Sequence, residues 1–289
     1  MSATDLGVDT PTTATPLGAG ARRRTLVVTV LALAAVLAVV VAAQFLGDAA
    51  RITHLDRKHL PPSTEHLFGT DWLGRDILAR TVVGLRLSLG VGLLAAAGST
   101  LIALLLAALA STFGGWVERS VIWLVDLFLA LPHLVLLILL TFALGGGTWA
   151  VVVAVAVTHW PSLTRVLLSR GRVVAASDYV ALSRGFGHRR TWVARHHVLP
   201  HLLPHAVVGG VLLFPHAILH EAALSFLGLG VDPSEPAVGV LLRDSMKFLS
   251  TGQWWLALLP GLCLLVLVKV VDTIGDNLRT LTDPRSHHR

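Results

Sequence analysis

Long apolar runs separated by short polar segments make up most of this chain. The first run, TLVVTVLALAAVLAVVVAAQFL at 25–46, contains no charged residue. A helix rises about 1.5 Å per residue, so about 20 apolar residues cross a hydrocarbon core of about 30 Å. Hydropathy predicts about six such spans, at 25–46, 86–111, 118–142, 148–168, 206–229 and 254–274. The pattern therefore predicts an all-α integral membrane protein with about six transmembrane helices.

The composition supports the same class of protein. Of the 289 residues, 54% are hydrophobic and 14% are charged, and the mean hydropathy is +0.73. A soluble domain of this size cannot bury so much apolar surface. The net charge of +6 does not predict nucleic-acid binding, because most basic residues lie in short segments beside the apolar runs. The single cysteine, Cys263, excludes an intrachain disulfide and a cysteine metal cluster.

The distribution of basic residues predicts the orientation in the membrane. With the N-terminus inside, Arg22–Arg24, the arginines of 165–205 and the C-terminal arginines all lie on the cytoplasmic side, and fewer basic residues lie outside. The positive-inside rule therefore favours a multi-pass protein of the cytoplasmic membrane with both termini in the cytoplasm. The first run is longer than the core of a signal peptide, which is about 7 to 15 residues, so we expect a retained anchor.

The same pattern predicts how the chain is divided. Residues 1–24, rich in Thr, Pro, Gly and Ala, are expected to form a disordered cytoplasmic tail. After it we expect a first transmembrane anchor at 25–46, an extracytoplasmic segment at 47–85, a five-helix core at 86–275 that includes a cytoplasmic loop at 169–205, and a cytoplasmic tail at 276–289.

The cytoplasmic loop is strongly basic and too long for a simple turn. Its sequence DYVALSRGFGHRRTWVARHHVLPHLLP contains helix formers, glycines at Gly185 and Gly187, and a predicted stop at Pro200. These features favour two short helices that lie across the cytoplasmic face and offer a docking surface. A basic loop held near anionic lipid headgroups is the alternative, and composition alone leaves both interpretations open.

Motifs for catalysis are broken or missing. A P-loop needs Gly-x-x-x-x-Gly-Lys-Ser/Thr, but the only lysines, Lys58, Lys247 and Lys269, are followed by His, Phe and Val. The string HEAAL at 220–224 begins like the zinc-protease motif His-Glu-x-x-His, but its last position is leucine. The chain is therefore expected to be a non-catalytic protein that binds no cofactor, and any ATP hydrolysis must occur in another polypeptide.

Several polar residues are predicted at membrane depth, where ionisable groups are costly and should face protein or water. His216 and His220 are four residues apart on one helical face, with Glu221 next in sequence, and can offer imidazole ligands to a divalent cation. Neutral histidines that bond to a neighbouring helix are the alternative. Pathway and packing roles stay equally open for His133 and His159, and the remaining polar residues of this kind are Asp126, Lys269 and Asp272.

Four segments resemble a known family. HLFGTDWLGRD at 66–76, EAALSFLGLGV at 221–231 and DNLRTLTDPR at 276–285 are similar to segments of permeases in the dipeptide, oligopeptide and nickel ATP-binding-cassette importer family. The cytoplasmic loop resembles the importer-permease signature, with Gly187 at the glycine position and Pro200 at the end. Ala181 departs from it, because family members often carry an acid there. The residues of the first segment that carry the resemblance are Gly69, Thr70, Asp71, Gly74, Arg75 and Asp76.

The resemblance implies an importer-permease fold whose cytoplasmic loop forms a coupling helix against an ATPase. It implies as partners a second homologous permease chain, two ATP-binding-cassette ATPase subunits that use ATP and Mg, an extracytoplasmic solute-binding protein and the lipid bilayer. The loop residues expected to carry the coupling are Asp178, Tyr179, Arg184, Gly185, Gly187, Leu199 and Pro200.

The solute expected from the resemblance is a peptide or nickel, free or chelated. The histidines at His159, His216 and His220 are similar to those of nickel-type members, so these residues with Glu221 are candidate pathway or metal contacts. An ion-coupled secondary transporter is the alternative function. It predicts inverted repeats around a midplane site, and no convincing repeat relates the two halves of the sequence.

Overall fold

The computed structural model describes residues 19–282, and this part of the chain is helical, without a β-strand. Five helices are long and apolar enough to cross a membrane, and a bent helix pair makes a sixth if the two helices are counted as one broken span. The five are α1 (Ala19–Phe45), α2 (Ile77–Phe113), α5 (Gly147–Ala175), α8 (Leu199–Phe226) and α10 (Trp255–Thr282); the pair is α3 (Gly115–Ala130) with α4 (His133–Ala143). The predicted all-α membrane fold is therefore confirmed.

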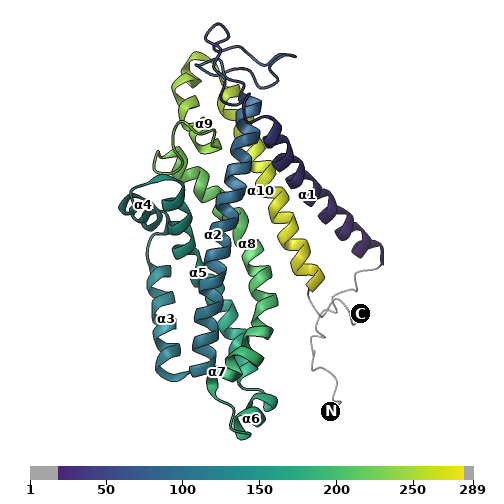
Figure 1. The fold of residues 1–289 in the computed structure, drawn as a ribbon, viewed down its shortest axis with the longest axis vertical. Helices are drawn as coiled ribbons and strands as arrows, with labels where there is room; N and C mark the ends of the chain where they lie inside the picture. Colours follow the sequence, from purple (N-terminus) through teal and green to yellow (C-terminus); the bar gives the residue numbers. More distant parts are fainter. Residues whose placement is uncertain (1–18, 283–289) are drawn as a thin grey trace, which may run out of the picture.

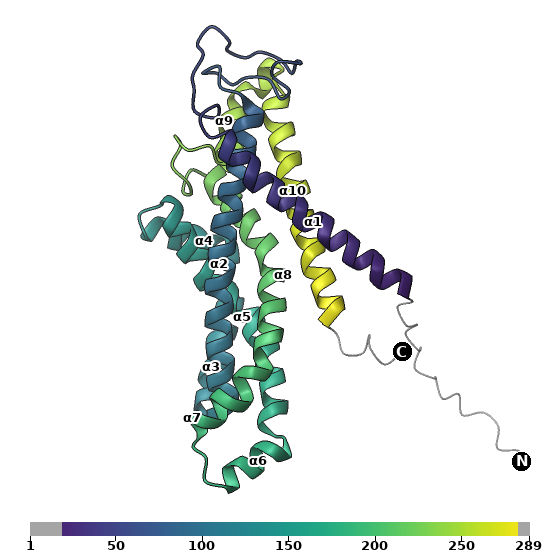
Figure 2. The same ribbon diagram turned by 45° about the vertical axis from the view of Figure 1, so that its right-hand side comes forward.

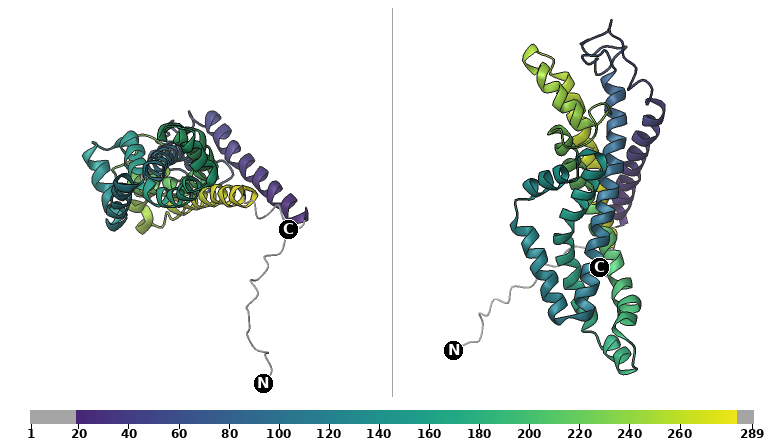
Figure 3. Two further views of the ribbon diagram at one scale, coloured as in Figure 1. Left: turned by 90° about the horizontal axis from the view of Figure 1, so that it is seen from below. Right: turned by 60° about the vertical axis from the view of Figure 1, so that its left-hand side comes forward.

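Helices α2, α5 and α8 form the centre of an elongated bundle (Figure 1). Helices α3 and α4 lie on one side of this centre, while α10 and α1 lie on the other (Figures 1 and 2). The most apolar window of α5 is 67% buried, whereas that of α1 is 11% buried. Helix α5 is thus central and α1 peripheral, which agrees with the view along the long axis in Figure 3.

Small residues allow the central helices to approach closely. Ala95, Ala103 and Ala107 of α2 are completely buried, and α2 packs along both α5 and α8. A Cβ added at Gly92 would lie 2.7 Å from Ile218 of α8. Small side chains at helix contacts are typical of membrane proteins, where close backbone packing replaces the hydrophobic effect as the source of association.

The predicted span at 118–142 is not a single uninterrupted helix. Helices α3 and α4 meet at an angle of 96°. Leu131 is extended, with φ −81° and ψ 142°, and Pro132 follows it. A residue before proline avoids the helical region, and proline itself supplies no N–H for the helix. This pair of residues therefore divides the apolar run into two helices.

The structure also corrects where several helices begin and end. Residues 19–24 belong to α1, 77–85 belong to α2, and 276–282 belong to α10, so the predicted tails and outer segment are shorter than expected. Pro200 is not a stop, because the helical chain runs through it from the π-helical turn at Ala194–Val198 into α8, which begins at Leu199. The predicted tail residues 1–18 and 283–289 lie outside the described residues.

Each end of the bundle carries short helices. At one end, which we call the α6 end, lie α6 (Asp178–Gly185) and α7 (Arg190–Val193), and a π-helical turn at Ala194–Val198 leads directly into α8. At the opposite end, the α9 end, lie the segment 46–76, α9 (Val238–Ser245) and a 3-10 helix at Met246–Thr251. The sequence analysis did not predict α9.

Candidate functional site

Helix α6 is attached to the bundle by one face and exposes the rest of its surface. Val180 is completely buried in the same apolar cluster as Val193, Val198 and residues of α2 and α5. Ser183, one turn later, bonds through its hydroxyl to Nε2 of His197 at 2.8 Å. The spacing of three residues places both side chains on the inner face of the helix. The other side chains of α6 are exposed.

The expected coupling residues lie together at the α6 end. Asp178 and Tyr179 are in the first turn of α6, where an acidic side chain favours the helix N-terminus, and the Tyr179 ring contacts the rings of His197 and His201. Arg184 and Gly185 end α6, Gly187 follows it, and Leu199 and Pro200 open α8. Gly187 has φ +85°, a conformation that glycine adopts without strain.

Two apolar side chains at this end were missed by sequence reasoning. Leu182 is 62% exposed and Phe186 is 82% exposed, and both line an open hollow with Asp178, Ala181 and Gly185. The sequence does contain a signal for them, because Leu182 and Phe186 are large apolar residues in a loop rich in basic and polar residues. Exposed apolar residues rimmed by charge are typical of a surface that another protein covers.

Three histidines from different helices form a cluster near the α3–α4 break. His133 begins α4, His159 lies in α5 and His220 in α8. Their ring centroids are 4.6, 5.0 and 4.9 Å apart, and one ligand nitrogen of each lies within 4.8 Å of the others. The structure therefore brings together two of the expected histidines, with His133 as the third.

His216 and His220, which the sequence predicted as a pair of possible metal ligands, do not both belong to this cluster. His216 is exposed, and its Nδ1 lies 3.3 Å from the carbonyl of Leu212 in its own helix. Only His220 of the pair belongs to the group whose nitrogens approach one another. Spacing of four residues places both on one side of α8, but only His220 has a ring nitrogen within 4.8 Å of nitrogens of His133 and His159.

Glu221 has a packing role in this structure. Its side chain is completely buried, and it accepts hydrogen bonds from the hydroxyls of Ser88 in α2 and Ser225 in α8. Ser225 in turn accepts a bond from the backbone N–H of Val231 at 3.1 Å. Successive residues of a helix point about 100° apart, so Glu221 faces α2 while His220 faces α4 and α5.

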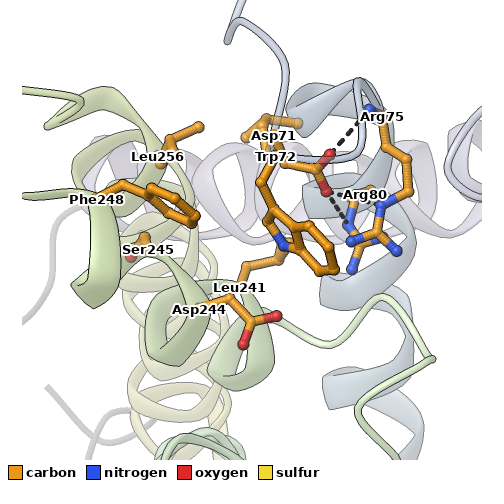
Figure 4. Close-up of a pocket in the computed structure, with 10 residues that line it drawn as sticks. Asp71, Trp72, Arg75, Arg80, Leu241, Asp244, Ser245, Phe248 and Leu256 are labelled. Carbon is orange, nitrogen blue, oxygen red and sulfur yellow. Dashed lines mark hydrogen bonds and ion pairs between the residues drawn. The ribbon is translucent and has the colours of Figure 1, made fainter. Parts of the chain in front are cut away.

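The segment at 66–76 folds into a closed network at the α9 end (Figure 4). One oxygen of Asp71 accepts from the backbone N–H groups of Leu73 and Arg75, and the other pairs with the Arg75 guanidinium at 2.7 Å. Arg80, which is 1% exposed, lies 3.9 Å from the same carboxylate. The cavity here measures about 20 Å³, which is room for one water molecule and not for a solute.

The remaining residues of this segment also have structural partners. Asp76 caps α2 by accepting from the N–H of Ala79, and its second oxygen lies 2.8 Å from Nδ1 of His66. Thr70 binds the backbone of the 57–60 segment through its hydroxyl. Gly69 and Gly74 have φ of +73° and +74°. The segment therefore builds the outer cap of the molecule.

Comparison with known proteins decides the class of this structure. The family described as "Binding-protein-dependent transport system inner membrane component" matches residues 99–284. This chain belongs to that family. It is 33% identical over 231 residues, 80% of this chain and 72% of the other, to the dipeptide transport system permease protein of Bacillus subtilis strain 168. It is 35% identical over 224 residues, 78% and 73% of the two chains, to the protein of the same name from Alkalihalophilus pseudofirmus.

Membership of the family settles several expectations. The chain is a multi-pass membrane protein and a permease subunit of an ATP-binding-cassette importer. It is non-catalytic, and ATP hydrolysis belongs to separate subunits. The family also works with a solute-binding protein. The exposed face of α6 and the closed cap at the α9 end are thus two surfaces of an importer subunit.

Proposed function

We propose that this chain forms half of the pore of an ATP-driven peptide importer in the cytoplasmic membrane. Two relatives that are named dipeptide transport permeases support a peptide as the solute. The observation that carries the mechanism is the form of α6, which is held by Val180 and Ser183 and is otherwise exposed. A short helix attached to the bundle in this way transmits a push from a neighbouring subunit as a rigid-body movement.

The occupant of this surface is an ATPase subunit. Leu182 and Phe186 supply apolar contact area, and the surrounding arginines, including Arg184 and Arg189, supply positive charge. Aromatic and apolar residues at the centre of an interface carry most of its binding energy. Movement of the docked ATPases would then shift the bundle between inward-facing and outward-facing states, with ATP and peptide each favouring one state.

The proposed assembly follows from this docking. The α6 end lies in the cytoplasm with both termini, which agrees with its arginines and the positive-inside rule. Two ATPase subunits, which use ATP and Mg, bind this chain and a second homologous permease chain, and the solute-binding protein approaches the α9 end. In this assembly ATP and Mg are bound by the partner ATPase subunits and not by the permease chain.

The test is uptake of a labelled dipeptide into cells that lack the gene or carry single substitutions. Phe186→Ser removes an aromatic side chain that is 82% exposed directly after α6. Loss of a central aromatic contact weakens docking by about 2 kcal/mol, a factor of about 30. We expect dipeptide uptake to fall strongly while the amount of permease in the membrane stays unchanged. Phe45→Ser is the matched control, because Phe45 is equally exposed at 82% but lies at the end of α1.

The same cells distinguish the alternatives. Normal dipeptide uptake in the deletion strain would contradict the peptide importer, and loss of labelled nickel uptake instead would favour nickel as the solute. Uptake that continues without the ATPase genes but stops with a protonophore would favour an ion-coupled transporter. Equal uptake in Phe186→Ser and Phe45→Ser would exclude α6 as the docking surface.

A further inference from the structure

The histidine cluster has a free ligand nitrogen that packing does not explain. Nδ1 of His159 lies 3.0 Å from the carbonyl oxygen of Val155. A carbonyl only accepts, so Nδ1 carries the proton and Nε2 carries the lone pair. Nε2 is buried and finds no donor among the described residues. A histidine that donates one ring N–H to the backbone and presents its other nitrogen is the usual arrangement of a metal ligand.

The two other histidines approach the same point. The His133 and His220 rings lie 4.6 and 4.9 Å from the His159 ring, centroid to centroid, yet no hydrogen bond joins the three rings within residues 19–282. Three imidazoles that pack for stability alone would satisfy this buried nitrogen with an N–H from a neighbour. The lone pair of this nitrogen is therefore open to a water hydrogen or to a cation, and the convergence of three imidazole nitrogens within 4.8 Å favours a cation.

The donor set selects the kind of cation. The group contains three imidazoles and no carboxylate, and the nearby Glu221 is occupied by two serine hydroxyls. Hard cations such as Mg²⁺ and Ca²⁺ need oxygen ligands, whereas imidazole suits Zn²⁺, Cu²⁺, Ni²⁺ and Co²⁺. Three protein nitrogens leave a fourth position for water.

We propose that His133, His159 and His220 bind a divalent transition-metal cation that connects α4 to α5 and α8. Metal–nitrogen bonds of about 2.0 Å put tetrahedral ligand nitrogens about 3.4 Å apart, so nitrogens that lie within 4.8 Å of one another close by side-chain rotation. Helix α4 has two buried residues, Leu137 and Thr141, and it follows a 96° break. The bound cation therefore fixes the direction of a short, weakly packed helix.

The experiment uses the purified full-length chain, stripped with a chelator and dialysed against Co²⁺, with Mg²⁺ as the negative control. Bound metal is counted by elemental mass spectrometry, and visible absorption of Co²⁺ reports nitrogen ligation in a tetrahedral site. We expect one Co²⁺ per chain. Single changes His133→Gln, His159→Gln and His220→Gln should each weaken binding by about 10-fold or more, the scale on which a metal site responds to loss of supporting groups.

Matched variants separate this site from other histidines. His216→Gln should keep full binding, because His216 lies one turn from His220 but outside the cluster. Other imidazoles lie near the α6 end, on His188, His196, His197, His201 and His205. The triple variant, in which all three cluster histidines are changed to glutamine, measures how much Co²⁺ these other histidines bind. Stoichiometric Co²⁺ binding that persists in the triple variant, or in His220→Gln if the triple variant does not insert, would overturn the proposal, as would absence of binding to the unmodified chain.

Discussion

The two ends of this permease use polar residues in opposite ways. At the α9 end, Asp71 and Asp76 bond to groups in or directly after their own segment, and the cavity beside Asp71 holds about one water. At the α6 end, one buried valine holds a helix whose apolar side chains lie exposed. A sequence motif that satisfies its own polar groups indicates a structural cap. An attached helix with exposed apolar residues indicates a surface for another subunit.

The largest expected effect is at the α6 end, from Gly187→Pro. Gly187 has φ +85°, whereas proline is fixed near −65°, so the turn between α6 and α7 must rearrange. We expect dipeptide uptake to be lost while membrane insertion, measured by the amount of permease in the membrane fraction, stays normal. Gly252→Pro is the control, because Gly252 has a similar φ of +84° and open space around it but lies at the α9 end. Full uptake in Gly187→Pro would contradict a coupling role for this turn.

The next effect is at the α9 end, from Asp71→Asn. This change removes the charge that pairs with Arg75 and with Arg80, whose side chains are 12% and 1% exposed. Removing one partner of a buried ion pair costs about 3 kcal/mol or more. We expect a lower unfolding midpoint in detergent.

The control for this change is Asp56→Asn. Asp56 pairs with Arg57 in solvent, with side chains that are 75% and 50% exposed, and exposed pairs contribute about 1 kcal/mol or less. Equal stability of the two variants would show that the Asp71 network does not support the cap. Lost uptake at unchanged stability would assign Asp71 a role in transport instead.

The smallest effect concerns the exposed turn before α9. The hydroxyl and backbone N–H of Ser234 donate to Asp232 and hold the pKa of that carboxyl below its usual value of 3.8. A lowered pKa in the folded state gives stability that is present above pH 3.8 and is lost as pH falls further. Carboxyl titration by NMR should show a lower pKa for Asp232 than for the same residue in Ser234→Ala; identical values would exclude this contact.

The sequence predicted the spans well because length and apolarity decide them without reference to neighbours. The prediction from sequence was wrong at positions where the conformation of one or two residues decides whether a helix continues. Leu131 with Pro132 breaks an apolar run that hydropathy treats as continuous. Pro200 does not end a helix, since it lies where the π-helical turn at Ala194–Val198 passes into α8. Hydropathy averages over such positions, so it cannot locate them.

The candidate site was predicted in part for a similar reason. The α6 end is one continuous segment, so its glycines, helix formers and basic residues were visible in order. The histidine cluster joins α4, α5 and α8, and periodicity within α8 suggested His216 as the partner of His220. Helix packing decides which residue of another helix lies opposite His220, and the spacing of residues along the sequence does not reveal it.

The break between α3 and α4 also tells which side of the subunit avoids lipid. Pro132 has no N–H, so the carbonyl of Phe128, four residues earlier, loses its helical donor. Acyl chains offer no replacement, and an unbonded carbonyl in hydrocarbon costs several kcal/mol. Helix α1, with continuous helical bonding and a window only 11% buried, tolerates lipid well. The α3–α4 side is therefore expected to face water or another protein subunit, such as the second permease chain proposed above, with α1 facing the bilayer.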